Sequence, residues 1–340
     1  MSTLLRKYSG AFHDGRDLHH DDAELFLDAL IEEPDESLLA GVFRAWDRKG
    51  ITENEIYAIA RIMRDRCVKI KTNQQRVVDI VGTGGSRNKT FNVSTASAFV
   101  VAGAGVPVAK HGNRAATSNT GSADVLSALG VEPAVDAATA ARCLNELGIC
   151  FMFAPNFHRL SPILAKVRRG LGFPTIFNCV GPLCNPAGAP HQLIGVWSES
   201  LVEKMANALA RLGTNKSWIV HGADGLDEIS LTGPTLVAEV ENGSVNMFEI
   251  VPEDFGQRSQ PADDICVRSA TESAEIIRAV LAGQQQEQVA ESITILNASA
   301  AFYLCGHFGE VTDGAFVATQ SIRDGRASEK LHQLAKATKE

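Results

Sequence analysis

Apolar and polar positions follow two different periods along this chain of 340 residues, and the change comes near residue 70. Before it, apolar residues recur at helical spacing, as they do from Ala23 to Ile31. Segments that start near Asp21, Leu38 and Thr52 therefore predict three short amphipathic helices. The first and third open with the patterns D-x-x-E and T-x-x-E, which are typical of a capping box.

From Arg76 onward, short apolar runs with the length and β-branching of buried strands alternate with helical segments. These runs cover residues 77–81, 106–109, 149–153, 191–197 and 217–220. The alternation predicts an α/β fold with a mostly parallel central sheet flanked by helices. We expect a small N-terminal helical domain at residues 1–72, with a contribution from about 155–178, and a larger α/β domain at 73–340.

The remaining segments are predicted as connections. Residues 181–186, GPLCNP, predict a rigid turn, and residues 232–268 predict a β-rich excursion. Helical segments close the chain at about 273–282, 288–305 and 313–323.

The first apolar run ends in a glycine-rich turn, Gly82-Thr83-Gly84-Gly85. Its three glycines can adopt positive φ and point successive N–H groups into one concavity. A predicted helix at about 94–104 follows, and the free amides at its N-terminus favour an anion. A glycine-rich turn after a strand is often only a turn, and this one matches neither the P-loop nor the dinucleotide-binding pattern.

The second run leads into Lys110-His111-Gly112-Asn113-Arg114, which adds two cations to the same region. A glycine-rich turn, a helix N-terminus and two cations within a short stretch predict a site for a highly phosphorylated small molecule.

The run at 217–220 leads into an acidic loop, HGADGLDE, that ends in Asp227 and Glu228. Ligands of open parallel sheets bind outside the carboxyl ends of the strands, where this loop is expected. Mg²⁺ suits such a pair, because it takes one or two carboxylates together with waters and substrate phosphates. An isolated acidic pair is more often a solvated turn, so the assignment requires that the pair face the glycine-rich turn.

Several polar side chains leave two interpretations open. Lys110 and Arg114 either balance phosphate charge or form surface ion pairs. Arg168 offers a fork that suits a carboxylate, or belongs to a solvated helix face. Asn113 offers both a donor and an acceptor, and His111 is either a ligand or a structural hydrogen-bonding group. No Ser/His/Asp or Cys/His arrangement is recognisable, so we expect no covalent nucleophile.

Composition narrows the class of protein. A net charge of −8 argues against nucleic-acid binding through bulk electrostatics. The seven cysteines contain no C-x-x-C pair, which fits reduced thiols in a cytoplasmic protein and does not fit a zinc site. No signal-like segment and no run of 18 apolar residues is present, so we expect no membrane association.

Seven sequence motifs follow one another along the chain: DIVGTGG, NVST, KHGNRA, GSADVL, VRRGLG, TIFNCVGPLCNPAG and VHGADGLDEISLTGP. Together they resemble the anthranilate phosphoribosyltransferase family, over nearly the whole chain. The resemblance implies a small helical domain on a larger α/β domain, paired as a homodimer through the small domain. It also implies attack of the anthranilate amine on the anomeric carbon of phosphoribosyl pyrophosphate (PRPP), with loss of pyrophosphate.

The resemblance also implies site residues. Mg²⁺ would be held by Ser94, Asp227 and Glu228, and anthranilate would meet Gly82, Asn113 and Arg168. PRPP would be bound by Gly82, Gly85, Ser86, Thr90, Asn92, Val93, Ser94, Thr95, Lys110, His111, Gly112, Asn113, Arg114, Ser118 and Ser122. A weakly basic aromatic amine needs positioning more than deprotonation, so no residue is predicted as a general acid or base.

Two positions depart from the family pattern. Ser86, followed by Arg87, stands where the family usually has Asp directly after GTGG, and Gly170 stands where it commonly has an acidic residue. These changes leave open another aromatic acceptor. Two further alternatives are a nucleoside phosphorylase and a non-catalytic relative that binds nucleic acid or has a regulatory role.

Overall fold

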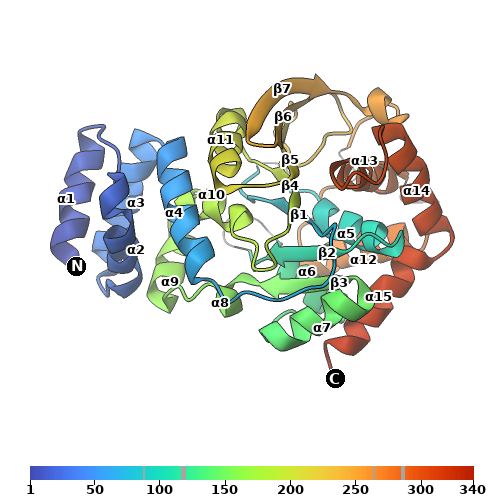
Figure 1. The fold of residues 1–340 in the computed structure, drawn as a ribbon, viewed down its shortest axis with the longest axis horizontal. Coiled ribbons are helices and arrows are strands. Elements are labelled where there is room, and N and C mark those ends of the chain that lie inside the picture. Colours follow the sequence, from blue (N-terminus) through green and yellow to red (C-terminus); the bar gives the residue numbers. More distant parts are fainter. Residues whose placement is uncertain (87–88, 116–119, 263–264, 285–287) are drawn as a thin grey trace.

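The structure is a computed structural model that describes residues 1–86, 89–115, 120–262, 265–284 and 288–340. A seven-stranded sheet forms its centre, in the order β3-β2-β1-β4-β5-β6-β7 (Figure 1). The first five strands in this order pair in parallel, and β6 and β7 add an antiparallel edge. The strands are β1 (Val78–Gly82), β2 (Val108–Gly112), β3 (Ile149–Phe153), β4 (His191–Gly195), β5 (Lys216–Gly222), β6 (Thr235–Glu241) and β7 (Ser244–Ile250).

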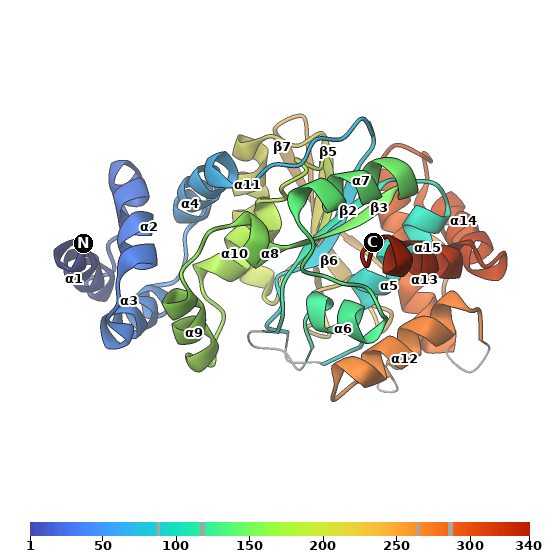
Figure 2. The same cartoon turned by 90° about the horizontal axis from the view of Figure 1, so that it is seen from below.

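Helices cover both faces of the sheet, which confirms the predicted α/β class (Figure 2). On one face, α5 (Val93–Gly103) contacts β1, and α13 (Gln288–Leu304) contacts β4 and α5. On the other face, α11 (Val202–Leu212) contacts β5 and β6. Helix α5 is apolar almost all round, and its described side chains are buried because it lies between the sheet and α13.

The other elements that follow β1 in the chain connect the strands and close the chain. They are α6 (Ser122–Ala128), α7 (Ala137–Leu147), α8 (Ala154–Phe157), α9 (Pro162–Gly170), α10 (Ile176–Leu183), η2 (Glu199–Leu201), η3 (Pro252–Phe255), α12 (Ala270–Leu281), α14 (Val311–Arg323) and α15 (Arg326–Ala337). The β-rich excursion and the helices α12 to α14 lie where the sequence predicted them, whereas α15 was missed.

The N-terminal segment is helical, as predicted, but it contains one helix more than the pattern indicated. It consists of α1 (Ser2–His13), η1 (His20–Asp22), α2 (Ala23–Glu32), α3 (Glu36–Lys49) and α4 (Glu53–Arg66). The missed helix, α1, packs against α3 and places Phe12 in a stack on Trp46, with 5.0 Å between the ring centroids. A short helix at a chain end is stabilised mainly by such tertiary packing, which local periodicity reveals poorly.

Two of the local predictions for turns and caps are wrong. The D-x-x-E pattern forms no capping box, because Asp21 lies within a turn of 3₁₀ helix and α2 begins after it, with Asp22 as an N-cap that makes no side-chain cap hydrogen bond. The expected turn at 181–186 begins later, because α10 continues through Pro182 to Leu183. The capping box of Thr52 and Glu55 is confirmed.

The helical segment is joined closely to the rest. The Arg64 side chain on α4 donates to the carbonyls of Leu183 and Leu212, at the ends of α10 and α11, with 3.0 Å to Leu212. Helix α9 contacts α3, and Lys166 pairs with Glu36 at 2.6 Å. These contacts support counting residues near 155–178 with the small domain, but the division at residue 72 stays a prediction. No helix among the described residues is long and apolar enough to cross a membrane.

Candidate active site at the carboxyl ends of the parallel strands

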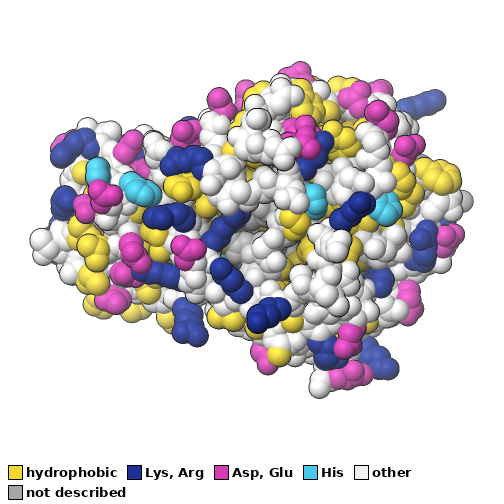
Figure 3. Space-filling model, viewed as in Figure 1, with side chains coloured by type: hydrophobic (Ala, Val, Ile, Leu, Met, Phe, Trp, Pro, Cys, Tyr) yellow, Lys and Arg dark blue, Asp and Glu magenta, His cyan; other side chains and the backbone are white. Residues whose placement is uncertain are grey.

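A cleft of about 410 Å³ opens at the carboxyl ends of β1, β2 and β5. The chain order in the sheet reverses at β1, which has β2 on one side and β4 on the other. Open parallel sheets bind ligands at such a reversal, because the connections on its two sides leave in opposite directions. Figure 3 shows this face of the molecule hollowed near its middle, with Lys and Arg side chains beside the hollow.

The glycine-rich turn forms one wall of the cleft. Gly84 and Gly85 have φ of 67° and 89°, as predicted, and Gly82 does not have positive φ. Gly82 instead leaves room for the acidic loop, since a Cβ there would lie 2.7 Å from Asp227 Oδ2. The Gly84 N–H donates to the same Asp227 oxygen at 2.9 Å. The turn and the acidic loop therefore meet, as the magnesium hypothesis required.

Asp227 and Glu228 both line the cleft. Burial raises the pKa of Asp227, and burial together with the Asp227 charge raises the pKa of Glu228 to about 8. Glu228 Oε1 accepts from the Ser94 N–H at 3.2 Å, which joins it to the first turn of α5. Two adjacent carboxylates under mutual repulsion fit a divalent cation. No cluster of three or more His, Cys, Asp or Glu suited to a metal occurs in the described segments, so further ligands would come from Ser94, water or substrate.

Lys110 is only 4% exposed, and the charges of Asp79 and Glu228 act on its ammonium group. Its Nζ donates to the Ile80 carbonyl at 2.6 Å and to Ser94 Oγ at 3.1 Å. Burial lowers its pKa, while Asp79 and Glu228 act in the opposite direction. Lys110 thus holds the Ser94 hydroxyl at the cleft.

The start of α5 is held by side chains from other elements. Asn92 Oδ1 accepts from Thr120 Oγ1 at 2.8 Å and from Ser273 Oγ at 3.0 Å. Thr90, Asn92 and Ser94 line the cleft, whereas Val93 and Thr95 are buried in the first turn of the helix and do not. Ser118 lies outside the described residues.

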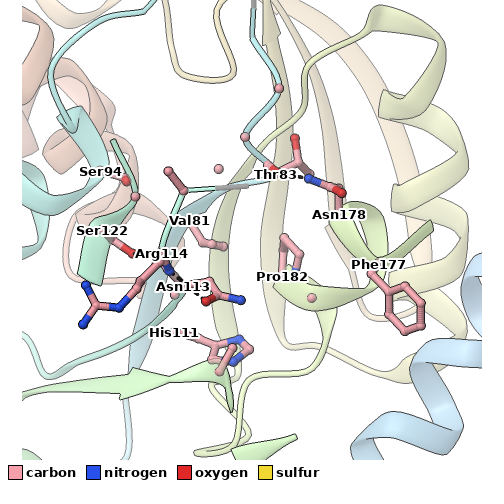
Figure 4. Close-up of a pocket in the computed structure, with 18 of the residues that line it drawn as sticks. Val81, Thr83, Ser94, His111, Asn113, Arg114, Ser122, Phe177, Asn178 and Pro182 are labelled. Atoms are coloured by element: carbon pink, nitrogen blue, oxygen red, sulfur yellow. Dashed lines mark hydrogen bonds between the residues drawn. The ribbon is translucent and has the colours of Figure 1, made fainter. Parts of the chain in front are cut away.

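The residues that follow β2 lie at the cleft, but the Arg114 side chain is held in an ion pair (Figure 4). Arg114 pairs with Asp124 at 2.8 Å, so the described structure favours the ion-pair interpretation for this side chain. Asn113 Oδ1 accepts from the Arg114 N–H at 2.7 Å. Gly112 makes space for Ser122, whose Oγ would lie 2.1 Å from a Cβ at this position.

His111 shares the lower wall of the cleft with His158. The centroids of the two imidazole rings are 5.0 Å apart, and Nε2 of each ring is buried without a hydrogen-bond partner in the described structure. Burial lowers the pKa of His111 to about 3 and that of His158 to about 4. Both imidazoles are therefore neutral near pH 7, and His158 is a cleft residue that the sequence analysis missed.

Arg168 approaches the cleft from α9. Its Nε donates to Thr175 Oγ1 at 3.2 Å, and its Cζ lies 4.9 Å from the Phe177 ring centroid. Burial, with a smaller effect of Arg169, lowers the pKa of Arg168 to about 10. The guanidinium is thus held in place and is poorly solvated, unlike an arginine on an open helix face.

Asn178 is a second cleft residue that the sequence analysis missed. Its Nδ2 donates to the Thr83 carbonyl at 3.1 Å, and its Oδ1 accepts from the Thr175 N–H at 3.0 Å (Figure 4). It joins the glycine-rich turn to the N-terminus of α10, beside Arg168. The only signal in the sequence was the T-x-x-N spacing of a capping box.

Ser86, which departs from the family pattern, is buried at 5% exposure. Its Oγ donates to the Gly225 carbonyl at 2.9 Å, so the hydroxyl links the glycine-rich turn to the acidic loop. Gly170, the other departure, ends α9 and is exposed.

Comparison with known proteins identifies the family. The model of the glycosyl transferase family, a/b domain, matches residues 74–328. An anthranilate phosphoribosyltransferase of Methylobacillus flagellatus is 47% identical over 297 residues, which cover 87% of this chain and 86% of the relative. The anthranilate phosphoribosyltransferase of Symbiobacterium thermophilum is 42% identical over 339 residues, which cover 99% of this chain and 98% of the relative. The chain belongs to the anthranilate phosphoribosyltransferase family.

Solved structures of anthranilate phosphoribosyltransferases share the fold. The enzyme of Thermus thermophilus has a TM-score of 0.88 and 34% identity, with 98% of this chain and 99% of that chain covered. The enzyme of Saccharomyces cerevisiae in complex with PRPP and Mg has a TM-score of 0.86 and 26% identity, covering 99% and 98%. The family and the fold predicted from the sequence are thus confirmed, while the roles of individual residues stay predictions.

Two of the buried histidines, His111 and His158, each make the stability of the fold sensitive to acid. Their pKa values lie below the ordinary value of 6.5, so the unfolded chain takes up protons first as the pH falls. Each histidine then removes up to about 1.4 kcal/mol of stability per pH unit below 6.5. Between pH 7 and pH 5, the thermal midpoint of His158→Gln should therefore fall less, or rise more, than that of the parent protein.

The exposed His332 provides the control for this comparison, since His332→Gln should leave the slope unchanged. Asp79, Asp227 and Glu228 act in the opposite direction, because burial raises their pKa values and their protonation favours the folded state, so the test compares the slopes of variant and parent. Equal slopes for His158→Gln and the parent protein would contradict the assignment of a buried, neutral His158.

Proposed function

We propose that this protein transfers the phosphoribosyl group of PRPP to the amine of anthranilate in an Mg²⁺-dependent reaction. The products are N-(5-phosphoribosyl)anthranilate and pyrophosphate, and the reaction is the second step of tryptophan biosynthesis. One observation carries the proposal beyond family membership: the acidic pair, the glycine-rich turn, Lys110 and the start of α5 line one cleft. Such a set of groups suits a substrate that carries several phosphates and a metal.

Asp227, Glu228 and Ser94 would hold Mg²⁺. The donor set fits this ion, because all three side chains offer oxygen and the carboxylates lie together at the cleft wall. When bound, Mg²⁺ neutralises charge that develops on the departing pyrophosphate. The chain itself keeps the two carboxylates close through the Gly84 and Ser94 N–H groups, against their mutual repulsion.

The PRPP phosphates would meet backbone N–H groups of the glycine-rich turn and of the α5 N-terminus, with the charge of Lys110 beneath them. Preorganised amides stabilise charge on the leaving group more in the transition state than in the ground state. The other predicted PRPP ligands that line the cleft, among them Thr90, Asn92 and Ser122, stay part of this proposal.

Anthranilate would lie between the Gly82 turn, Asn113 and Arg168. The Arg168 guanidinium would bind its carboxylate, and the amine would then face the anomeric carbon. His111 and His158 are neutral near pH 7, and their low pKa values make them weak bases. This agrees with a reaction that depends on positioning rather than on a strong general base.

Replacing Arg168 by Gln should weaken acceptor binding selectively. We expect KM for anthranilate to rise by about 30-fold, because a charge-assisted carboxylate contact contributes about 1.5–3 kcal/mol. KM for PRPP should change by less than about threefold, since the donor groups lie on other elements. Initial rates with each substrate varied in turn measure both constants.

Arg169→Gln is the matched control, because Arg169 is the exposed neighbour on the same helix and does not line the cleft. A rise in KM for PRPP alone, or equal effects of both variants, would contradict the assignment of Arg168 to the acceptor.

The proposed function is tested by following anthranilate fluorescence after mixing protein, PRPP and Mg²⁺, with a metal-free control. A rapid, Mg²⁺-dependent loss of fluorescence is expected. No loss, with PRPP still raising the thermal midpoint, would indicate a different acceptor. Release of free base from a nucleoside by phosphate would indicate a phosphorylase, and no response to any of these ligands would refute an enzymatic role.

We also propose a homodimer formed through helices α1 to α4. Support comes from Leu25 on α2, which is 57% exposed, and from the partly exposed Ile31 and Leu38 nearby in the sequence. Sedimentation equilibrium should give twice the chain mass of 36.4 kDa, and Leu25→Glu should shift the protein toward the monomer.

A further inference from the structure

A buried asparagine on α13 holds the backbone next to the acidic pair. Asn297 is 0% exposed and does not line the cleft. Its Oδ1 accepts from the Ile229 N–H at 3.0 Å, and its Nδ2 donates to the Ile229 carbonyl at 3.2 Å. Nδ2 also donates to the Ile293 carbonyl of its own helix at 2.9 Å. One side chain therefore pairs with both polar backbone groups of the residue that follows Glu228.

The backbone that Asn297 holds has no regular secondary structure of its own. After β5 ends at Gly222, residues 223–234 form turns and bends, and both carboxylates lie in this loop. Part of the loop is held from within, since Asp224 accepts from the Leu226 N–H and the Ser230 hydroxyl. Asn297 adds a restraint from a different element, immediately after the acidic pair.

Helix α13 also supports the other side of the proposed cation site. Ser97 on α5 donates to the Thr294 carbonyl of α13 at 3.1 Å, one turn before Asn297. Ser94 lies one turn earlier on α5 and is the third predicted cation ligand. The same helix thus contacts both elements that bear the ligands, and its position sets the distance between Ser94 and the two carboxylates.

We propose that Asn297 is a positioning residue for the divalent cation. It fixes the loop of Asp227 and Glu228 relative to α5, so that the carboxylates stay together at the cleft. The inference rests on the proposed function, because it presumes that this pair binds Mg²⁺. An apolar residue would fill the same volume but leave two buried backbone groups unpaired, which favours movement of the loop.

The test compares Asn297→Leu and Asn297→Ser with Thr294→Val. Thr294 is an equally buried polar residue of α13, but its hydroxyl donates to Ala290 of its own helix and does not reach the acidic loop. The first readout is the Mg²⁺ concentration that gives half-maximal activity. The second readout needs no turnover. It is the decrease in the electron paramagnetic resonance signal of free Mn²⁺ when protein and PRPP are added.

Both Asn297 variants should require about 10-fold more Mg²⁺ and bind Mn²⁺ about 10-fold more weakly, as changes behind metal ligands typically do. At saturating Mg²⁺, KM for anthranilate should stay within about threefold of the parent value. Thr294→Val should match the parent protein in every metal measurement.

Metal binding equal to that of the parent protein in both Asn297 variants would overturn the inference. Loss of folded structure in both variants, with Thr294→Val intact, would also overturn it, because Asn297 would then support the fold as a whole. A parent protein that neither needs Mg²⁺ nor binds Mn²⁺ would instead refute the proposed metal site itself.

Discussion

Replacing Asp227 and Glu228 together by Asn and Gln should abolish nearly all turnover. We expect kcat/KM to fall by about 1000-fold or more, because the variant loses both carboxylates that would hold the cation against the leaving group. Residual activity should no longer respond to Mg²⁺. Product formation in single turnovers, followed by anthranilate fluorescence over a range of Mg²⁺ concentrations, measures both effects.

The loss should occur without unfolding. The pKa of each carboxyl group is raised in the folded protein, so its ionised form costs stability at neutral pH, and neutral amides remove that cost. The thermal midpoint of the metal-free variant should therefore equal or exceed that of the parent protein. Glu241→Gln with Glu249→Gln removes the same charge from exposed strand positions and should leave activity unchanged. A double amide variant that kept its Mg²⁺ response would place the metal elsewhere.

Replacing Gly195 by Ala should also lower catalytic activity strongly, although less than the double replacement of Asp227 and Glu228, and although Gly195 has no side chain to lose. A Cβ at this position, the end of β4, would lie 1.7 Å from the carbonyl oxygen of Asp227 and 2.3 Å from its carbonyl carbon. Backbone cannot rotate away as a flexible side chain can, so the acidic loop must move. We expect about a 100-fold loss of kcat/KM from misplaced carboxylates and about 1–3 kcal/mol less stability, the usual effect of overpacking.

Gly41 provides the control, since it lies inside α3 and a Cβ there would meet nothing within 4 Å. Gly41→Ala should keep full activity and stabilise the protein by about 0.5–1 kcal/mol, because alanine loses less backbone entropy in a helix. Steady-state kinetics and urea denaturation distinguish the two variants. Normal Mg²⁺-dependent activity in Gly195→Ala would show that the position of the Asp227 backbone is not critical.

Part of the site was predictable because strand ends carry their loops to a common place. The sequence showed apolar runs followed by GTGG, KHGNR and DGLDE, and parallel strands bring such loops to one edge of a sheet. The structure places Gly84 against Asp227 and Ser94 against Glu228, as that reasoning required. These interactions follow from strand direction, which a sequence pattern reveals.

Other cleft residues were not predictable in this way. His158 and Asn178 reach the cleft from segments whose orientation depends on packing of α8 and α10. The engagement of Arg114 by Asp124 and the clearance at Gly82 and Gly195 likewise depend on neighbours distant in sequence.

The sequence by itself determined the class of fold, the order of its strands and helices apart from α1, α10 and α15, and the loops that carry charge. It could do so because hydrophobic periodicity and turn chemistry are local properties. Only the tertiary structure decided which glycines make room for a carboxylate, which cations are already paired, and that Asn297 of α13 holds the acidic loop. Those features arise from contacts between residues far apart in the chain, and no local pattern encodes their distances.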